Sequence, residues 1–550
     1  MKRSHRCALI SIVLISFLAR SIPFFQHTLW GMDSGEYVYY TRQWVTTGRI
    51  YLSVDGWADA YPFFPGMFAL NGSVNMAGMH IFHSVAFASL ILSTFIPLSI
   101  FLISHKITGD VRSSLYSALF LSMLAPFIYS ISQPKPETVG FFIMLIIILM
   151  SVMLTKGDKR LVFLMVTASL ALIVTHHFSS LFLMIFLYGG LFLSVLARDD
   201  IEIADRYRLA FFLFFTTTTI LYWLTAAPPF REGRLLGAFG FPSYTILLGP
   251  YIGVGILLIL KKIVAKNGLR PSIYLHRENL NRFYLLSLPL VMIISSIIIY
   301  LYFYPLPGRE MTIGELGLYY IPITLLGIFV LGSSKILWAF KDGVHLYGWI
   351  SITIVTFFVG FITGSTSLLP MRQVAFIMIP TSILFGIGLL RFQCMANPFS
   401  TLRRTFVIGV FIIALFAYNV PLMYPSQEMA QGHNEAIGWD EISGGFWIRY
   451  SLEDKIAAEH RLSSSIFAVG YTNITWVDGW AIYFSNDIEE ALEEAHEMDV
   501  RYIIWDQKSM RGVATTDGAH PYPMSRVLID FYSSNYMVYS GRETVLYVVP

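Results

Sequence analysis

Residues 137–155 read ETVGFFIMLIIILMSVMLT, a stretch with one charged side chain at its start and none after it. A helix needs about 20 consecutive apolar residues to cross a bilayer, because each residue advances about 1.5 Å and the hydrocarbon core is about 30 Å thick. Runs of this kind recur along the chain, separated by charged or Pro- and Gly-rich breaks. The sequence therefore predicts a protein built from many membrane-spanning helices.

The composition of the whole chain supports the same prediction. Of its 550 residues, 55% are hydrophobic and only 13% are charged, and the mean hydropathy is +0.61. A soluble fold needs more charge to cover its surface, so the bilayer must act as the solvent. The net charge of +3 is small and spread out, which argues against nucleic-acid binding. Cys7 and Cys394 both lie beside predicted cytoplasmic helix ends, which excludes a disulfide framework.

We expect about thirteen transmembrane helices. Their approximate bounds are 7–25, 77–104, 114–132, 137–155, 161–177, 178–197, 209–227, 244–260, 283–303, 316–334, 346–363, 372–390 and 405–423. The hinge at 175–180 is so short that the fifth and sixth spans could instead form one long broken helix.

The N-terminus carries Lys2, Arg3 and Arg6 before its first apolar run, and no small-residue cleavage site follows that run. We interpret it as a retained signal-anchor helix that begins in the cytoplasm. Lys and Arg are more frequent in the alternate loops that this orientation places in the cytoplasm, such as 198–208 and 261–282. An odd number of spans in the cell membrane then places the C-terminal tail on the extracytoplasmic side.

Two external segments are unlike simple connectors. The first, 26–76, mixes carboxylates with aromatic residues, and loops of that length usually carry function or lie on the membrane surface. In the second, 424–550, hydrophobicity falls and soluble-domain patterning begins. We expect strands at 464–469, 502–505 and 543–549 and an acidic amphipathic helix at 488–498. The predicted fold class is a polytopic α-helical membrane protein, with a transmembrane domain at 1–423 and a small extracytoplasmic α/β domain at 424–550.

The first candidate site is Gly31-Met32-Asp33-Ser34-Gly35-Glu36, just outside the first span. If a helix begins near Ser34, the two carboxylates can converge on one cation or one hydroxyl. One carboxylate could accept a proton from an attacking alcohol, while the other holds a metal ion or a sugar hydroxyl. The alternative is a helix cap, in which Asp33 accepts hydrogen bonds from the amides of Gly35 or Glu36.

The position of Asp33 and Glu36 resembles the GT-C superfamily of membrane glycosyltransferases, in which one helix follows a short cytoplasmic N-terminus and a long acidic external loop comes next. The superfamily includes oligosaccharyltransferase catalytic subunits and protein O-mannosyltransferases, which take a sugar from a polyprenyl-phosphate carrier. The likeness extends through Arg42 to the segment around Tyr61. It implies that Asp33 is the catalytic base, that Glu36 is an accessory carboxylate and that Tyr61 binds substrate. It also implies a divalent cation, Mg or Mn, at Asp33 and Glu36.

The next external connection reads Ser-Gln-Pro-Lys-Pro-Glu at 132–137. Its two prolines fix an extended turn, and Glu137 sits at a helix start, where the helix dipole favours a carboxylate. A capping role explains Glu137 without any ligand. The resemblance offers a second role, because oligosaccharyltransferase subunits carry another acidic motif in this loop. Glu137 would then be its counterpart, and Lys135 would contact phosphate.

Three further residues are candidates for phosphate binding. His176 and His177 lie at the hinge after the fifth span, and one of them could face the pocket as a phosphate or cation partner. Interfacial histidines without any ligand are the alternative. Arg372 opens the twelfth span, where it could snorkel to the interface or bind a phosphate leaving group. The resemblance implies the second role, because a late helix of the GT-C group carries an arginine that meets the carrier phosphate.

Charged residues are almost absent from the middle of the predicted spans and collect at their external ends. This distribution suits an inverting transfer at the extracytoplasmic face, from a polyprenyl-phosphate sugar donor to a hydroxyl or amide of a protein, lipid or glycan acceptor. Asp33 would activate the acceptor, and Arg372 would stabilise the departing phosphate. The alternatives are a transporter of a lipid-linked or small solute, which would bury ionisable groups near the midplane, and a non-catalytic membrane scaffold.

Overall fold

A computed structural model describes residues 1–51, 57–154, 158–197, 203–228, 243–266, 342–363, 370–395 and 434–549, together with some positions between 406 and 424. Within the last range, 476–479, 513–523, 536 and 542–543 are not described. The chain forms two compact units. Unit 1 consists of Met1–Ser16, Phe95–Phe127 and Gly140–Asn419, and unit 2 consists of Phe17–Thr94, Ile128–Val139 and Val420–Pro550. Unit 2 joins the predicted external loop, 26–76, to the tail, so the predicted division into 1–423 and 424–550 does not coincide with these units.

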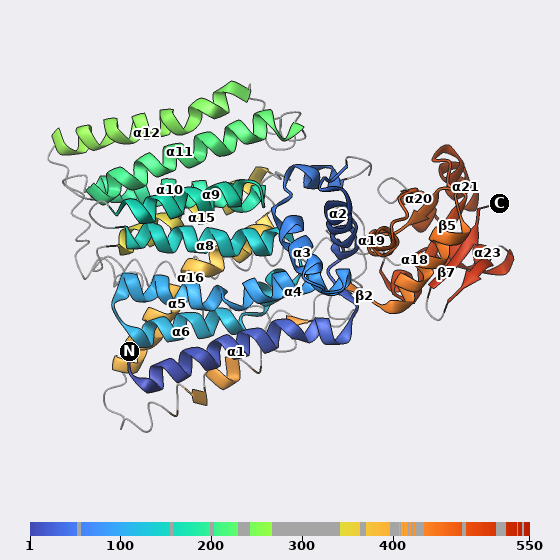
Figure 1. Ribbon diagram of the computed structural model, residues 1–550, viewed down its shortest axis with the longest axis horizontal. Coiled ribbons are helices and arrows are strands. Elements are labelled where there is room, and N and C mark those ends of the chain that lie inside the picture. Colours follow the sequence, from blue (N-terminus) through green and yellow to red (C-terminus); the bar gives the residue numbers. More distant parts are fainter. Residues whose placement is uncertain are drawn as a thin grey trace. The chain divides into compact units, whose positions relative to one another are not determined.

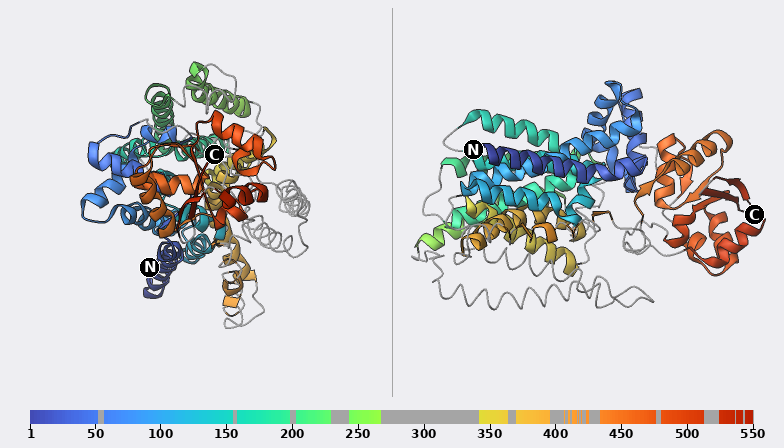
Figure 2. Two further views of the ribbon diagram at one scale, coloured as in Figure 1. Left: turned by 90° about the vertical axis from the view of Figure 1, so that its right-hand side faces the viewer. Right: turned by 90° about the horizontal axis from the view of Figure 1, so that it is seen from below.

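Unit 1 is a bundle of helices that run roughly parallel to one another (Figure 1) and are seen nearly end-on in the left view of Figure 2. Its helices are α5 (Ile96–Thr108), α6 (Val111–Met123), α8 (Pro136–Met153), α9 (Lys159–Ile173), α10 (His177–Ala197), α11 (Ile203–Thr225), α12 (Ser243–Lys266), α15 (Gly343–Thr363) and α16 (Pro370–Met395). Both α1 (Arg3–Gln26) and α7 (Ala125–Ser132) are divided between the units, as is the beginning of α8.

Several helices have the length and composition of membrane spans. Among the described residues, five segments are long and apolar enough to cross a bilayer: Arg3–Gln26, Ile81–Thr108, Pro136–Met153, His177–Val195 and Ile203–Thr225. Large apolar side chains such as Phe163 and Ile259 are exposed, as expected of surfaces that face lipid. The chain is therefore an integral multi-pass membrane protein. The total of thirteen spans and the orientation stay predictions, because 283–303, 316–334 and most of 405–423 lie outside the described residues.

Two predicted spans are each divided into two helices. The span predicted at 77–104 consists of α4 (Ile81–Thr94) and α5, which meet at Phe95. Pro97 lies in the first turn of α5, where its missing N–H costs no helical hydrogen bond. The span predicted at 114–132 is divided in the same way into α6 and α7. At the short hinge that follows α9, α10 begins at His177, so the fifth and sixth predicted spans are separate helices.

The helices α10 and α15 approach each other closely through two glycines. A Cβ atom on Gly189 would lie 2.6 Å from the carbonyl oxygen of Gly348, and a Cβ atom on Gly348 would overlap with the carbonyl oxygen of Gly189. Small residues allow helix backbones in a membrane to pack at short distance, where van der Waals contacts are strongest. This contact therefore requires glycine at both positions.

In unit 2, the predicted external loop is mostly helical. It contains β1 (Leu29–Trp30), α2 (Ser34–Thr47), the 3₁₀ helix η1 (Trp57–Phe63) and α3 (Gly66–Met76), which leads to α4. Strand β1 pairs antiparallel with β2 (Ala436–Ile437), with Leu29 opposite Ile437. The beginning of this loop is thus joined by backbone hydrogen bonds to the beginning of the tail.

The tail contains a five-stranded mixed sheet in the order β4-β3-β5-β7-β6. Strand β3 is parallel to β4 and β5, whereas β7 is antiparallel to β5 and β6. The strands are β3 (Ile456–Ala458), β4 (Ile474–Thr475), β5 (Tyr502–Asp506), β6 (Met537–Ser540) and β7 (Thr544–Val548). The helices are α18 (Trp439–Ser451), α19 (His460–Val469), α20 (Trp480–Phe484), α21 (Ile488–Glu497), α22 (Gln507–Arg511) and α23 (Arg526–Asn535).

Both faces of the sheet are buried under helices. Alternate residues of a strand point to opposite faces, so Ile504 of β5 packs with Leu462 and Ile466 of α19, while Ile503 and Trp505 pack with the other cluster. That second cluster also includes side chains of α20, α21 and α23. Helix α19 is therefore fixed against one face of the sheet.

The structure corrects one predicted element of the tail and confirms three. Residues 464–469, predicted as a strand, belong to helix α19. Glu459 caps its first turn by accepting a hydrogen bond from the amide of Arg461, and Gly470 ends it with φ +92°. The short apolar run 466–469 resembles a buried strand, but Leu462 and Ile466 are spaced four apart, as a helix requires. The predictions at 488–498, 502–505 and 543–549 correspond to α21, β5 and β7.

We expect Gly348→Ala to destabilise the bundle by about 1–3 kcal/mol, because the added methyl group must push α10 and α15 apart. Gly255→Ala in α12 is the matched control, since a Cβ atom there meets nothing within 4 Å. Thermal unfolding of the purified protein in detergent measures both variants. Equal unfolding midpoints for the two variants would contradict a close α10–α15 contact.

Candidate functional site

The carboxylate of Asp33 lies between two other parts of unit 2. Its Oδ2 atom accepts a hydrogen bond of 3.0 Å from the hydroxyl of Tyr37, and its Oδ1 atom lies 3.0 Å from Nε2 of His460. The Asp33 side chain is 18% exposed, so a second molecule can reach it. Asp33 is therefore a carboxylate held in one orientation with an accessible edge.

Glu36 approaches the same histidine but is enclosed by protein. Its side chain is 3% exposed, and Oε1 lies 3.8 Å from Nε2 of His460. Neither carboxyl oxygen has a hydrogen-bond partner within the described part of the chain. Burial, and then the charge of Asp33, raise the pKa of Glu36 to about 8, although the charge of His460 opposes the rise. Glu36 is thus mainly neutral near pH 7.

His460 is the first residue of α19 and brings a positive charge to these two carboxyl groups. Burial lowers the pKa of an imidazole, but here the hydrogen bond with Asp33 and the charges of Asp33, Glu36 and Glu459 outweigh it and raise the pKa of His460 to about 9. The imidazole is therefore protonated at neutral pH. It can donate Nε2–H to the Asp33 carboxylate as a charge-assisted hydrogen bond.

A buried ion cluster beside His460 fixes the start of α19. The Arg461 guanidinium lies 3.0 Å from Oε1 of Glu441, 2.8 Å from Oε1 of Glu459 and 2.8 Å from Oδ2 of Asp506. Burial disfavours the charged guanidinium, but these three carboxylates raise the pKa of Arg461 above its usual value. The cluster joins α19 to the first turn of α18 and the end of β5. It therefore sets where His460 can lie.

The alternative in which the Asp33 side chain caps its own helix is wrong. Asp33 does occupy the N-cap position of α2, which begins at Ser34, but its side chain accepts no hydrogen bond from the first turn. Oγ of Ser464, in α19, accepts one of 2.9 Å from the amide of Gly35 and lies 3.4 Å from the amide nitrogen of Glu36. A serine from the tail thus caps α2, and the Asp33 carboxylate is left for other contacts.

Tyr61 belongs to the same group through Tyr37. The two hydroxyls are 3.0 Å apart, and the rings meet edge to face with their centroids 5.4 Å apart. Burial, followed by the charge of Asp33 and the nearby Tyr61, raises the pKa of Tyr37 well above its usual value. Tyr37 therefore stays protonated and can donate to Asp33 while Tyr61 supports it.

Lys135 and Glu137 lie in unit 2, at the start of α8. Glu137 is buried, and its Oε1 atom has no hydrogen-bond partner within the described part of the chain. Helix α7, which precedes them, is linked to the turn before Asp33 through Glu435. The hydroxyl of Tyr129 donates to Oε1 of Glu435, and Oε2 of Glu435 accepts from the amide of Met32. Among the described residues, neither Lys135 nor Glu137 forms a hydrogen bond or ion pair with Asp33. Their part in the site stays a prediction.

The other predicted residues lie in unit 1. Nδ1 of His176 accepts a hydrogen bond of 3.2 Å from the amide of Ser179 and lies 2.8 Å from its hydroxyl, so His176 caps the start of α10. The ring of His177 contacts that of His176, with centroids 5.1 Å apart. Arg372 is the third residue of α16, and its side chain lies outside the described residues. A phosphate-binding role for these three residues stays a prediction.

Sequence reasoning missed His460, Ser464 and Tyr37. Tyr37 could have been predicted from the sequence, because it lies four residues after Asp33 and so on the same helical face. His460 and Ser464 are also four apart, but they belong to the segment that was partly assigned to a strand. In a strand those side chains would lie on one face of the sheet, with no indication that α2 packs against them.

The donor set at Asp33 does not fit the divalent cation that the resemblance implied. Nε2 of His460 lies 3.0 Å from Oδ1 of Asp33 and 3.8 Å from Oε1 of Glu36, so an imidazole already occupies the position between the two carboxyl groups. In the parts of the chain that the structure describes, no three His, Cys, Asp or Glu side chains are placed to hold a metal ion. Any role of Mg or Mn stays a prediction.

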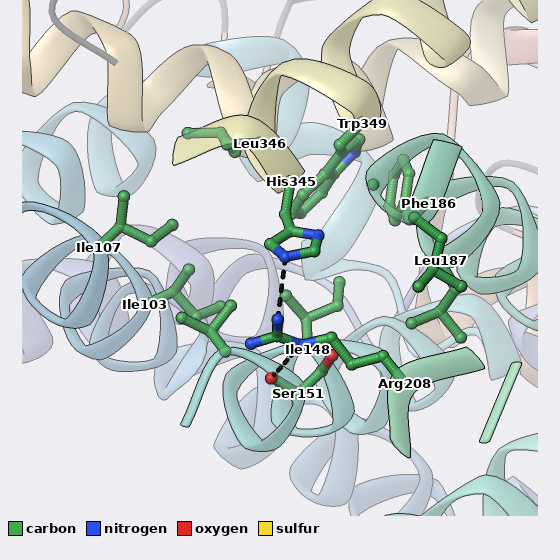
Figure 3. Close-up of a pocket in the computed structure, with 13 residues that line it drawn as sticks. Ile103, Ile107, Ile148, Ser151, Phe186, Leu187, Arg208, His345, Leu346 and Trp349 are labelled. Atoms are coloured by element: carbon green, nitrogen blue, oxygen red, sulfur yellow. Dashed lines mark hydrogen bonds between the residues drawn. The ribbon is translucent and has the colours of Figure 1, made fainter. Parts of the chain in front are cut away.

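A second group of buried charged residues lies in unit 1, near the starts of α11 and α15 (Figure 3). Arg208 donates Nε–H to the carbonyl of Ser151 at 3.0 Å, and its Nη1 atom lies 2.8 Å from Asp205 and 3.0 Å from Nε2 of His345. Arg208 and His345 border a pocket whose other walls are mostly aliphatic and aromatic side chains of α5, α8, α10 and α15. Because these charges satisfy one another, their arrangement is explained by structural pairing.

No protein-family model and no curated protein sequence matches the chain. Among solved structures, it is similar to the archaeal oligosaccharyltransferase AglB from Archaeoglobus fulgidus. The apo form of that enzyme gives a TM-score of 0.61 at 13% identity, over 92% of this chain and 70% of that chain. Its complex with an inhibitory peptide and a dolichol-phosphate gives 0.60 at 12%, over 92% and 69%. Its complex with Zn and sulfate gives 0.59 at 12%, over 98% and 72%. The chain therefore has the GT-C fold, and the resemblance is confirmed at that level.

The buried Glu36 carboxyl makes the stability of unit 2 depend on pH. Its folded pKa of about 8 exceeds the usual 4.5, so the folded state retains a proton that the unfolded state loses. The resulting stabilisation is fully present below the unfolded pKa of 4.5 and is lost as pH rises through the folded pKa of about 8. We expect the thermal unfolding midpoint to fall between about pH 5 and about pH 8 and to fall less in Glu36→Gln, which mimics the neutral carboxyl. Parallel curves for the two proteins would show that Glu36 is ionised in the fold.

Proposed function

We propose that the chain is an inverting glycosyltransferase that moves a sugar from a polyprenyl-phosphate-linked donor to an acceptor hydroxyl or amide at the extracytoplasmic face of the membrane. The observation that carries this proposal is the Asp33 carboxylate, which is released from capping its own helix, oriented by His460 and Tyr37, and partly exposed. An ionised carboxylate in a fixed orientation is suited to accept a proton from a nucleophile.

The proposed reaction has one bond-forming and one bond-breaking event at the anomeric carbon. The acceptor oxygen or nitrogen attacks that carbon from the face opposite the phosphate, and its proton passes to a carboxylate oxygen of Asp33. The bond between the anomeric carbon and the phosphate oxygen breaks, and the lipid phosphate leaves with the electron pair. Attack from the opposite face inverts the configuration of the sugar. His460 keeps its own proton throughout and holds Asp33 in place.

The phosphate requires cationic partners, because negative charge develops on it as the bond breaks. We assign this role to Arg372, with Lys135, His176 and His177 as further phosphate contacts. Glu137 and Tyr61 would contact the sugar or the acceptor. Among these residues, the hydrogen bond between the Tyr61 and Tyr37 hydroxyls supports a place for Tyr61 beside the base.

The fold supports a lipid-linked donor. AglB, which shares the fold, was solved with a dolichol-phosphate and an inhibitory peptide, and the donor of this chain would be a related lipid phosphate. Its acceptor would be a protein, a lipid or a glycan. A site at the outer membrane surface would meet both partners, since the carrier's head group lies there and the acceptor comes from outside.

Transport is the alternative, and the charged group in unit 1 is the observation that favours it. Asp205, Arg208 and His345 are ionisable residues buried between apolar helices, a common feature of ion pathways. However, Asp205 is the third residue of α11 and His345 the third of α15, so the group lies at helix ends rather than at their middle. Flux of a labelled solute through proteoliposomes, abolished by Asp205→Asn but not by Asp33→Asn, would support transport and contradict transfer.

We expect Asp33→Asn to lower kcat by about 10²–10⁴-fold, because an amide cannot take the proton although it retains the shape of the carboxylate. Asp530→Asn is the control, since Asp530 is an exposed residue of α23 and undergoes the same chemical change. The assay presents purified protein with a panel of radiolabelled polyprenyl-phosphate sugars and counts transferred sugar. Equal turnover by the wild type and Asp33→Asn would exclude Asp33 as the base.

A further inference from the structure

The first turn of α2 has two possible caps. One is the side chain of Asp33, which occupies the N-cap position, and the other is the hydroxyl of Ser464, which lies 429 residues beyond Gly35 in the sequence and does accept from its amide. A helix ordinarily receives this hydrogen bond from its own N-cap residue. The oxygens of Asp33 and Ser464 therefore compete for the same amide groups, and in this structure Ser464 binds them.

The same helix that caps α2 also binds the carboxylate it has displaced. His460 and Ser464 are four residues apart in α19, so they project from one face of that helix. Ser464 contacts the amides of α2, and His460 contacts Oδ1 of Asp33.

This contact depends on glycine at position 35. A Cβ atom on Gly35 would overlap with the backbone carbonyl of Ser464. Farther along the same pair of helices, the rings of Tyr39 and Phe467 meet at a centroid distance of 6.1 Å. Because Gly35 has no side chain, the backbone of α19 can approach α2 closely enough for the Ser464 hydroxyl to reach the amide of Gly35.

We propose that α19 is a positioning element for the site, in which Ser464 takes over the cap of α2 and His460 holds the released Asp33 carboxylate toward the acceptor. This inference rests on the proposed function and deepens it, because it assigns to two residues of the tail the orientation of the base. Without Ser464, Asp33 turns back to cap its own helix, and its oxygens are no longer available to the acceptor. His460 and Ser464 are positioning residues and do not themselves touch the reacting atoms.

Kinetics of four variants test the inference, with wild-type protein in detergent and a radiolabelled polyprenyl-phosphate sugar as donor. Ser464→Ala is expected to lower kcat by roughly ten- to a hundredfold with little change in KM, since misplacing a reacting group by about 1 Å costs about that much. His460→Leu is expected to do the same, and His460→Gln to be less impaired because its amide N–H can still donate. Ser465→Ala is the control, because among the described residues that hydroxyl donates to the carbonyl of Leu462 within α19.

A second measurement does not depend on turnover. In full-length protein with ¹³C-labelled histidine rings, the resonance that disappears in His460→Gln is followed against pH. Its midpoint should lie near 9 in the wild type and in Ser465→Ala, and should move toward 6.5 in Ser464→Ala as Asp33 leaves the imidazole. An unchanged midpoint in Ser464→Ala overturns the inference, as does a wild-type kcat in that variant. If the wild type transfers no sugar but the midpoint moves, the proposed function fails while the positioning of Asp33 stands.

Discussion

The packing of α19 against α2 is the contact on which the site depends. It brings together one helix from the beginning of the chain and one from the end, and both helices have an unusual residue at the point of contact: Gly35 on α2 and Ser464 on α19. A helix terminus has amide groups that need acceptors, and a carboxylate needs donors. Here Ser464 of α19 accepts from an amide of α2, and His460 of α19 lies beside the Asp33 carboxylate. The Asp33 side chain therefore does not cap its own helix and can contact another molecule.

The position of α19 is itself determined by charges in the interior of unit 2. Arg461 has three carboxylate partners, and Lys508 pairs with Glu441, so the cluster contains more negative than positive groups. Such a cluster adds little net stability compared with apolar packing, but it tolerates few alternative arrangements, because breaking one pair leaves an uncompensated charge and costs about 3–5 kcal/mol. Apolar packing against the sheet buries one face of α19. The ion cluster around Arg461 fixes the orientation of the neighbouring His460.

The sequence predicted the parts of the site that depend on local order. The spacing of Asp33 and Glu36 allowed the two carboxylates to converge if a helix began near Ser34, as α2 does, and the resemblance of that segment to the GT-C superfamily implied the fold. The sequence did not predict His460, because contacts between distant segments depend on packing that no local pattern encodes. The neutral Glu36 was missed for a related reason: its pKa depends on complete burial, which a segment that mixes polar and aromatic residues does not reveal.

The pairing of β1 with β2 and of α2 with α19 has a consequence for biosynthesis. The partners of the first external loop are separated from it by more than 400 residues, 429 in the case of Gly35 and Ser464. At about 5–20 residues per second, a ribosome needs roughly 20–90 s to make that length of chain. During this time the nascent protein has many of its apolar helices but neither β2 nor α19, so a partly inserted chain is anchored in the bilayer before Asp33 can meet His460.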